Sequence, residues 1–280
     1  MAVLPVLPGL NISVLVDGEL ATEHIPQPSY FPPLIDATGH QRIEHNQCYI
    51  ESRADSHFAI RFRISSDFKF PWGKTILIIS IYVDGKPFDA RLFQKRFIVS
   101  ATRGGKECGD YITYCHREYS AGSCETYNPI FQDIRHPGQS NTALMDNMTN
   151  VNAAFQTDDG SGISDPDSIK ALGSIQVAIT VARDRGPGIA VNNEFNDDKR
   201  EPLSIDSDAL HRYGSGQIHG TIYARAAENP EMEYVAVDRE VHIGNFFFYY
   251  QSPAAEGARF SLQPRFIDCD ANNIVHTRKP

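Results

Sequence analysis

The stretch Phe58-Ala59-Ile60-Arg61-Phe62-Arg63-Ile64 places four bulky apolar side chains on one side of an extended chain and two arginines on the other. Alternation with a period of two is typical of a β-strand that has one face in a core and one in water. Leu10 to Asp17 and Ile175 to Val181 follow the same period. Together the three stretches predict two β-sheet layers that close over a shared apolar interior.

Two other stretches are apolar on both faces. Thr75 to Val83 reads as a central strand covered on both sides, and the following Asp84-Gly85 pair indicates a tight turn, as Asp17-Gly18 does after the first strand. Phe246 to Tyr250 also suits a strand between two apolar layers better than a platform for stacking ligands. Further strands are expected at Cys48 to Glu51, Ile218 to Ala226, Tyr234 to Val237 and Val241 to Ile243. Leu92 to Ser100, Tyr111 to Tyr119 and Thr126 to Ile134 are strand candidates with mixed patterning.

Polar segments rich in proline, glycine and asparagine separate these strands. We expect a surface loop at 26–33 and long insertions at about 136–170 and 184–215, with a short helix at 206–211 inside the second insertion. The expected fold is therefore all-β: an antiparallel two-layer β-sandwich with long polar loops and at most one or two short helices. We expect residues 1–270 to form one domain and residues 271–280 to form a flexible tail; division into two domains at 136–170 stays an alternative.

Charge and cysteine content limit the environments that suit the chain. With 26 Lys and Arg against 35 Asp and Glu, the net charge is −9, which opposes general attraction to nucleic acid or to anionic lipid. Apolar runs are too short to span a bilayer. Pro5 and Pro8, with no preceding Lys or Arg, argue against a secretion signal, so we expect an intracellular protein, cytoplasmic or nuclear, with its five cysteines as thiols. Use of the sequons at Asn11 and Asn147 is accordingly not expected.

One cluster of soft metal ligands stands out: Cys108, Cys115, His116 and Cys124. Zinc accepts such ligands, but the six and eight intervening residues lack the close Cys-x2-Cys spacing of a structural zinc site. Adjacent Cys115 and His116 would also point to opposite faces of a strand. We therefore expect no metal here and keep a metal-dependent protein or enzyme that uses these residues as the alternative.

Other candidate motifs are weaker. Trp72-Gly73-Lys74-Thr75 ends like a phosphate-binding loop, but Phe68 occupies the position of its first glycine and a strand is expected to follow. The acidic segment 158–167 lacks the ligand order of a calcium-binding loop. His24, His40, His45 and His57 accompany no recognisable nucleophile motif. No catalytic or cofactor-binding residue is predicted.

The order of several short segments resembles a large family of fungal proteins catalogued as domain of unknown function 7918. The similar segments are Leu7 to Leu10, Val16 to Gly18, Tyr49 to Glu51, Phe58 to Ile60, Val83 to Lys86, Leu172 to Ile175, His219 to Thr221 and Phe246 to Ser252. The resemblance implies an intracellular, β-rich fungal protein and brings no established activity, cofactor or catalytic residue.

We therefore expect a binding or interaction module rather than an enzyme. Binding residues of a sandwich commonly lie on its connecting loops, and the sequence offers no convergent catalytic set. The partner, most simply another protein, is not specified by the sequence; nucleic acid and membrane are not expected partners.

Overall fold

The computed structural model describes residues 2–25, 34–35, 42–120, 123–133, 171–188, 219–226 and 234–251. These residues form an all-β fold with a single α-helix among them. The expected loop at 26–33, the insertion at 136–170, the helix at 206–211 and the tail at 271–280 lie outside the described residues. The stretch 184–187, expected to begin the second insertion, instead continues a strand.

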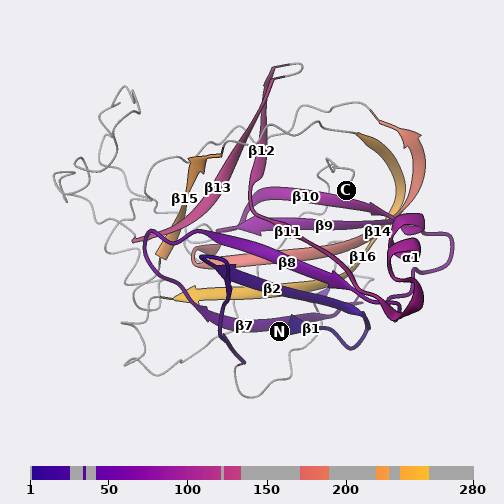
Figure 1. Cartoon of the computed structure of the whole chain (residues 1–280), viewed down its shortest axis with the longest axis horizontal. Coiled ribbons are helices and arrows are strands. Elements are labelled where there is room, and N and C mark those ends of the chain that lie inside the picture. Colours follow the sequence, from indigo (N-terminus) through magenta and orange to yellow (C-terminus); the bar gives the residue numbers. More distant parts are fainter. Residues whose placement is uncertain are drawn as a thin grey trace.

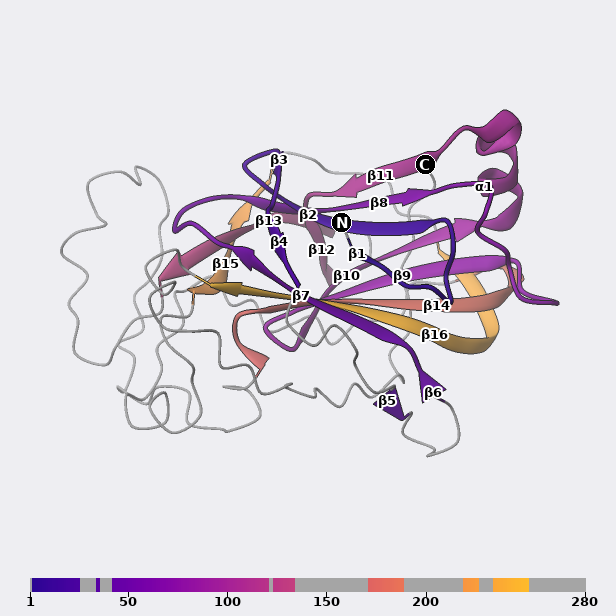
Figure 2. The ribbon, with the colours of Figure 1, turned by 90° about the horizontal axis from the view of Figure 1, so that it is seen from below.

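Two sheets form the main layers (Figures 1 and 2). The five-stranded sheet contains β1 (Ala2–Val3), β2 (Leu10–Val16), β3 (Glu19–Leu20), β8 (Phe58–Ile64) and β11 (Cys108–Ile112). The six-stranded sheet contains, in spatial order, β10 (Lys86–Gln94), β9 (Ile76–Val83), β14 (Ser174–Pro187), β16 (Val235–Gln251), β7 (His45–Glu51) and β4 (Glu23–His24). Pairing is antiparallel except between β16 and β7, which run parallel.

The remaining elements lie around these layers. A three-stranded sheet contains β12 (Cys115–Ser120), β13 (Ser123–Asp133) and β15 (His219–Arg225), and a two-stranded one contains β5 (Leu34–Ile35) and β6 (Arg42–Ile43). The helix α1 (Lys95–Ala101) and the 3-10 turn η1 (Arg103–Gly105) lie at the end of the sandwich away from β13 and β15 (Figure 1).

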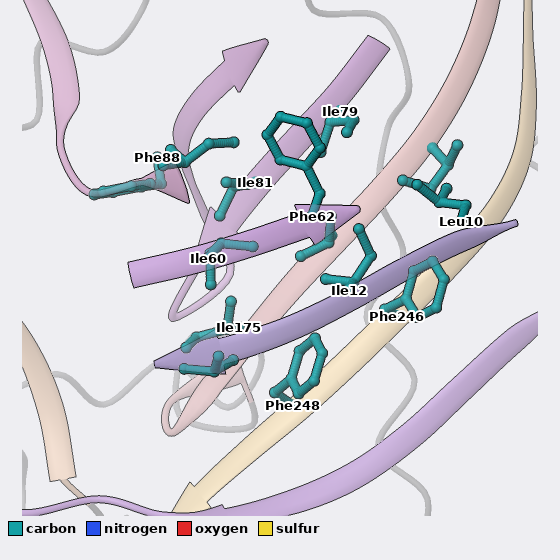
Figure 3. Close-up of a cluster of buried hydrophobic side chains, with 14 of the residues drawn as sticks. Leu10, Ile12, Ile60, Phe62, Ile79, Ile81, Phe88, Ile175, Phe246 and Phe248 are labelled. Carbon is teal, nitrogen blue, oxygen red and sulfur yellow. The ribbon is translucent and has the colours of Figure 1, made fainter. Parts of the chain in front are cut away.

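The predicted alternation produces the core. Phe58, Ile60, Phe62 and Ile64 of β8 are buried in the main core. Ile60 and Phe62 lie among apolar side chains of β9, β14 and β16 (Figure 3). Phe246, Phe248 and Tyr250 enter the same core, whereas Phe247 and Tyr249 pack with Tyr49 on the outer face of the sheet. Two apolar faces on one strand thus have two separate apolar partners, which confirms that Phe246 to Tyr250 belongs to the core.

Both Asp-Gly turns are confirmed. Asp17-Gly18 joins β2 to β3 and Asp84-Gly85 joins β9 to β10, and all four residues have positive φ between 50° and 83°. Two consecutive residues with positive φ define the hairpin turn whose twist matches that of the flanking strands, and Asp-Gly is among the pairs that adopt it most readily.

The strand expected at Leu92 to Ser100 is wrong beyond Gln94. Gln94 pairs with Ile76, the first residue of β9, so the following residues have no partner strand on that side and form α1. Ile98 buries its side chain and anchors the helix in the core. The strands expected separately at 234–237, 241–243 and 246–250 are one strand, β16, whose register with β14 shifts at three places.

Candidate functional site

The structure does not bring the soft-ligand candidates together in the described residues. Cys108 lies opposite Ile64 in the five-stranded sheet, whereas Cys115 lies opposite Tyr127 in the three-stranded sheet and faces the main core. Burial, and to a lesser extent Asp110, raises the pKa of Cys108, which disfavours the thiolate that binds metal. No group of three potential ligands among the described side chains is arranged to hold a metal ion, and the side chain of Cys124 is outside that set.

The candidate histidines are also dispersed. His24 lies 3.6 Å from Glu51 at the edge of the six-stranded sheet. His45 is buried at the other end of β7, and its Nε2 lies 3.0 Å from the side-chain Nε2 of Gln47. His57 is exposed just before β8. His40 and the acidic segment 158–167 lie outside the described residues.

Instead, the structure reveals a buried hydrogen-bonded cluster around Asp84, which we call the Asp84 cluster. One carboxylate oxygen, Oδ1, accepts hydrogen bonds from the Tyr250 hydroxyl at 2.6 Å and from the Gly173 amide at 2.8 Å. The other, Oδ2, accepts from the Thr221 amide at 3.0 Å, and the Thr221 and Tyr250 hydroxyls are 2.9 Å apart. One side chain in the β9–β10 turn therefore ties together the start of β14, β15 and the end of β16.

Burial dominates the acidity of this carboxyl group. It raises the pKa of Asp84 from 3.8 to about 6, and the hydrogen bonds from Tyr250, Gly173 and Thr221 offset only part of that rise. Burial together with the nearby carboxylate raises the pKa of Tyr250 well above its usual range, so its hydroxyl stays a donor. The chemistry of the cluster is that of a structural tie between strands.

The raised pKa predicts a pH-dependent stability. Between pH 3.8 and about 6 the folded state binds more of this proton than the unfolded state, so the contribution of Asp84 to the free energy of unfolding decreases as pH rises, by about 2–3 kcal/mol. We expect Asp84→Asn to remove this contribution from the pH profile. Urea titrations of both proteins at several pH values between 4 and 7 check it, and identical slopes in the two profiles would contradict the assigned cause.

A second buried chain of hydrogen bonds has the residue types of a serine hydrolase. The Ser52 Oγ lies 2.7 Å from Nδ1 of His219, and Nε2 of His219 lies 2.9 Å from Asp133 Oδ1. Burial lowers the pKa of His219 despite the neighbouring Asp133, so a neutral ring can donate from Nε2 to Asp133 and accept the Ser52 hydroxyl proton at Nδ1. The sequence did not reveal this series of hydrogen bonds, because Ser52 and His219 are 167 positions apart.

The exposed fractions of Ser52 and Asp133, which end this series of hydrogen bonds, argue against nucleophilic catalysis. Ser52 is 0% exposed, whereas the Asp133 side chain is 78% exposed. A hydrolase needs the reverse: a hydroxyl that substrate can reach, and a sheltered carboxylate that orients the imidazole. The ring nitrogens also take the opposite partners from those in the usual serine protease triad. The arrangement therefore fixes β7, β13 and β15 to one another.

A third cluster contains His116, the histidine of the predicted soft-ligand group. His116 Nδ1 lies 3.2 Å from Asp89 Oδ2, Arg91 Nη1 lies 2.9 Å from the same oxygen, and all three side chains are buried. Arg91 also stacks over the Tyr114 ring at 5.5 Å. Burial alone would raise the pKa of Asp89, but Arg91 and His116 outweigh it and lower that pKa, so the carboxylate stays charged.

A candidate binding surface, exposed to solvent, lies at the end of the sandwich that carries α1. We call residues 65–75 and 94–106 the basic end, because these two segments contain six Lys and Arg against one acidic residue, a segment charge of +5. Of the six cations, Lys74 already interacts electrostatically with Glu240 of β16. Trp72, the single tryptophan of the chain, is 98% exposed there. Phe97 and Val99 of α1 are 37% and 48% exposed. Exposed fractions like those of Phe97 and Val99 occur elsewhere on the molecule, but Trp72 is the most exposed large apolar side chain among the described residues.

The backbone holds Trp72 outward on a well-anchored turn. The Lys74 amide donates to the Pro71 carbonyl at 3.1 Å, and Gly73 has φ +74°, as expected for the third residue of a type II turn. The next residue, Thr75, donates its amide to Ala182 and accepts from the Lys95 amide, both at 2.8 Å. The indole is thus presented by a turn that β14 and α1 hold in place, which limits the ordering entropy that binding would cost.

The described residues define an all-β, sandwich-like protein whose polar clusters are buried and whose exposed candidate is an aromatic, basic surface. The family model described as Domain of unknown function (DUF7918) matches residues 9–255, and the chain belongs to this family. No curated protein and no solved structure is significantly similar to the chain. Among the described residues, no helix has the length and apolar character needed to cross a membrane.

The residues of the Asp84 cluster belong to segments that resemble the family. Asp84, Gly173, Thr221 and Tyr250 come from four of the separate short segments that carry the resemblance, and they meet at one carboxylate. These segments therefore have a structural role in common, because each supplies one side of the contact that joins β9, β14, β15 and β16.

Proposed function

We propose that this protein is a non-enzymatic binding module and that the basic end carries its protein-binding surface. The supporting observation is Trp72, nearly fully exposed on an anchored turn. Tryptophan and arginine are enriched among residues that dominate protein interfaces, and an anchored turn loses little backbone freedom when a partner covers its indole. The buried position of Ser52 and the dispersal of the candidate ligands support a role without catalysis.

Removal of the indole tests this proposal. We expect Trp72→Ala to weaken retention of the partner by about 30-fold, because a truncated interface tryptophan costs about 2 kcal/mol or more. Immobilised wild-type and variant proteins are incubated with lysate of the source cells at low and physiological salt, and retained proteins are quantified by mass spectrometry. Since Trp72 is almost fully exposed, the substitution leaves the core intact, and a thermal melt verifies folding.

Tyr111→Ala provides the matched control. Tyr111 is also an exposed aromatic residue, at 51%, but it lies on β11 outside the basic end. We expect this variant to retain the same proteins as the wild type. Retention of no protein by the wild type, or equal retention by the Trp72 variant, would contradict the proposed surface.

We further propose that the protein is intracellular. Cys48 and Cys108 lie in the described part of the chain without a disulfide between them, as suits a reducing compartment, and the resemblance to intracellular fungal proteins points the same way. A fluorescent fusion recovered mainly from the culture medium would contradict this location.

A further inference from the structure

Resting on the proposed function, we propose that the basic end recognises a short acidic segment of a partner protein, in which carboxylates flank an apolar side chain that covers Trp72. Charge asymmetry is the first ground. The chain carries −9 overall while the basic end carries +5, so the rest of the molecule carries −14. A cationic surface on a strongly anionic protein is a local feature with a specific electrostatic complement.

The availability of the cations is the second ground. Lys69, Lys95, Arg96, Arg103 and Lys106 are all exposed, and within the described residues none of them forms an ion pair. By contrast, Arg63 just outside the basic end already pairs with Glu107 at 3.1 Å. The exposed cations of the basic end thus remain open to carboxylates from another molecule.

Two of these cations are held against aromatic rings. The Arg96 guanidinium lies 4.9 Å from the centre of the Phe97 ring and donates from Nε to Gln94 Oε1 at 2.7 Å. The Lys95 ammonium lies 5.6 Å from the centre of the Phe70 ring. Aromatic contacts of this kind restrict long side chains while leaving their remaining donors for a carboxylate. The surface therefore combines ordered cations with an exposed indole.

The range of the electrostatic force distinguishes a short segment from an extended polyanion. At physiological ionic strength exposed charges are screened beyond about 8 Å, so a short segment placed on the basic end interacts with that local charge. A duplex or a membrane surface extends past the basic end, and the net charge of −9 on the whole chain opposes general attraction to such an extended polyanion. The net charge of −9 therefore favours a short peptide segment over either alternative.

The test uses a pool of short random peptides made of glutamate, aspartate, leucine and phenylalanine. A matched pool replaces the acidic residues by glutamine and asparagine. We expect the full-length protein to retain the acidic pool at least about tenfold more strongly than the amide pool at low salt, and to lose that preference at high salt. Because Trp72 is the single tryptophan, a blue shift of its emission on peptide addition locates the binding.

Charge reversal with a matched control completes the design. Arg96→Glu places an acidic residue in the first turn of α1, where the helix dipole favours it, so the helix is maintained. We expect it to weaken retention of the acidic pool about three- to tenfold, and Lys95→Glu combined with it to weaken retention further. Arg53→Glu makes the same charge change at an exposed site between β7 and β8, at the other end of the sandwich, and should have little effect.

Several outcomes would overturn this inference: equal retention of both pools, retention of neither, or equal effects of Arg96→Glu and Arg53→Glu. Tighter Arg96-dependent binding of phosphatidylserine vesicles or of duplex DNA than of the acidic pool would also overturn it. If Trp72 still governs retention of lysate proteins while the acidic pool fails, the acidic segment is wrong and the binding-module proposal stands. If retention of lysate proteins does not depend on Trp72 and the acidic pool also fails to bind, both proposals are wrong.

Discussion

Replacing Asp84 with alanine is expected to lower the free energy of unfolding by about 3–5 kcal/mol. The substitution removes the acceptor of the Tyr250 hydroxyl and of the Gly173 and Thr221 amides in one step. A buried donor left without an acceptor costs about 1–3 kcal/mol, and neighbouring losses of this kind do not add fully. The loss is measured by urea denaturation at pH 7, with two-state behaviour checked by two spectroscopic probes.

The chain contains a matched control for this substitution at its other Asp-Gly turn. Asp17 has φ +50°, almost the same as the +51° of Asp84, but its side chain accepts one hydrogen bond, from the His57 amide at 3.0 Å. Asp17→Ala therefore carries the same backbone cost with fewer lost contacts, and we expect a loss of about 1–2 kcal/mol. Similar losses at the two turns would show that the Asp84 cluster adds nothing beyond turn geometry.

Local alternation explains why most of the sheet was predictable. At Phe58 to Ile64 the predicted buried and solvent-facing positions match the structure residue by residue, because burial on one face is recorded in the sequence as a period of two. The error after Gln94 arose because Phe97, Ile98 and Val99 look like strand residues. Whether a strand continues depends on a partner, and β9 starts only at Ile76.

The polar clusters could not be predicted in the same way, since their members are far apart in the chain. The Tyr250 and Asp84 partners are 166 positions apart and Gly173 and Asp84 are 89 apart. The only local signal was the Asp84-Gly85 pair, which predicted the turn and said nothing of its contacts. Trp72 shows a related limit: Phe68, Phe70 and Trp72 look alike in the sequence, but Phe68 is buried and Trp72 is not.

The second large effect is expected at Asp89, whose removal leaves Arg91 as a buried cation without its carboxylate. We expect Asp89→Ala to lower the free energy of unfolding by about 3–5 kcal/mol, as for other buried ion pairs that lose one partner. His116 would lose its contact with the same carboxylate, 3.2 Å away. Thermal and urea denaturation of the purified variant measure the loss.

The double substitution Asp89→Leu with Arg91→Met separates the cost of an uncompensated charge from the value of the pair itself. Replacing a buried ion pair by apolar side chains of similar volume is often close to neutral, because the large desolvation cost of both ions disappears with their attraction. We therefore expect the double variant to be more stable than Asp89→Ala by about 2 kcal/mol or more, although Arg91 also loses its contact with Tyr114. A double variant that is less stable than Asp89→Ala would mean that the charged cluster stabilises the fold through specific contacts that apolar packing cannot replace.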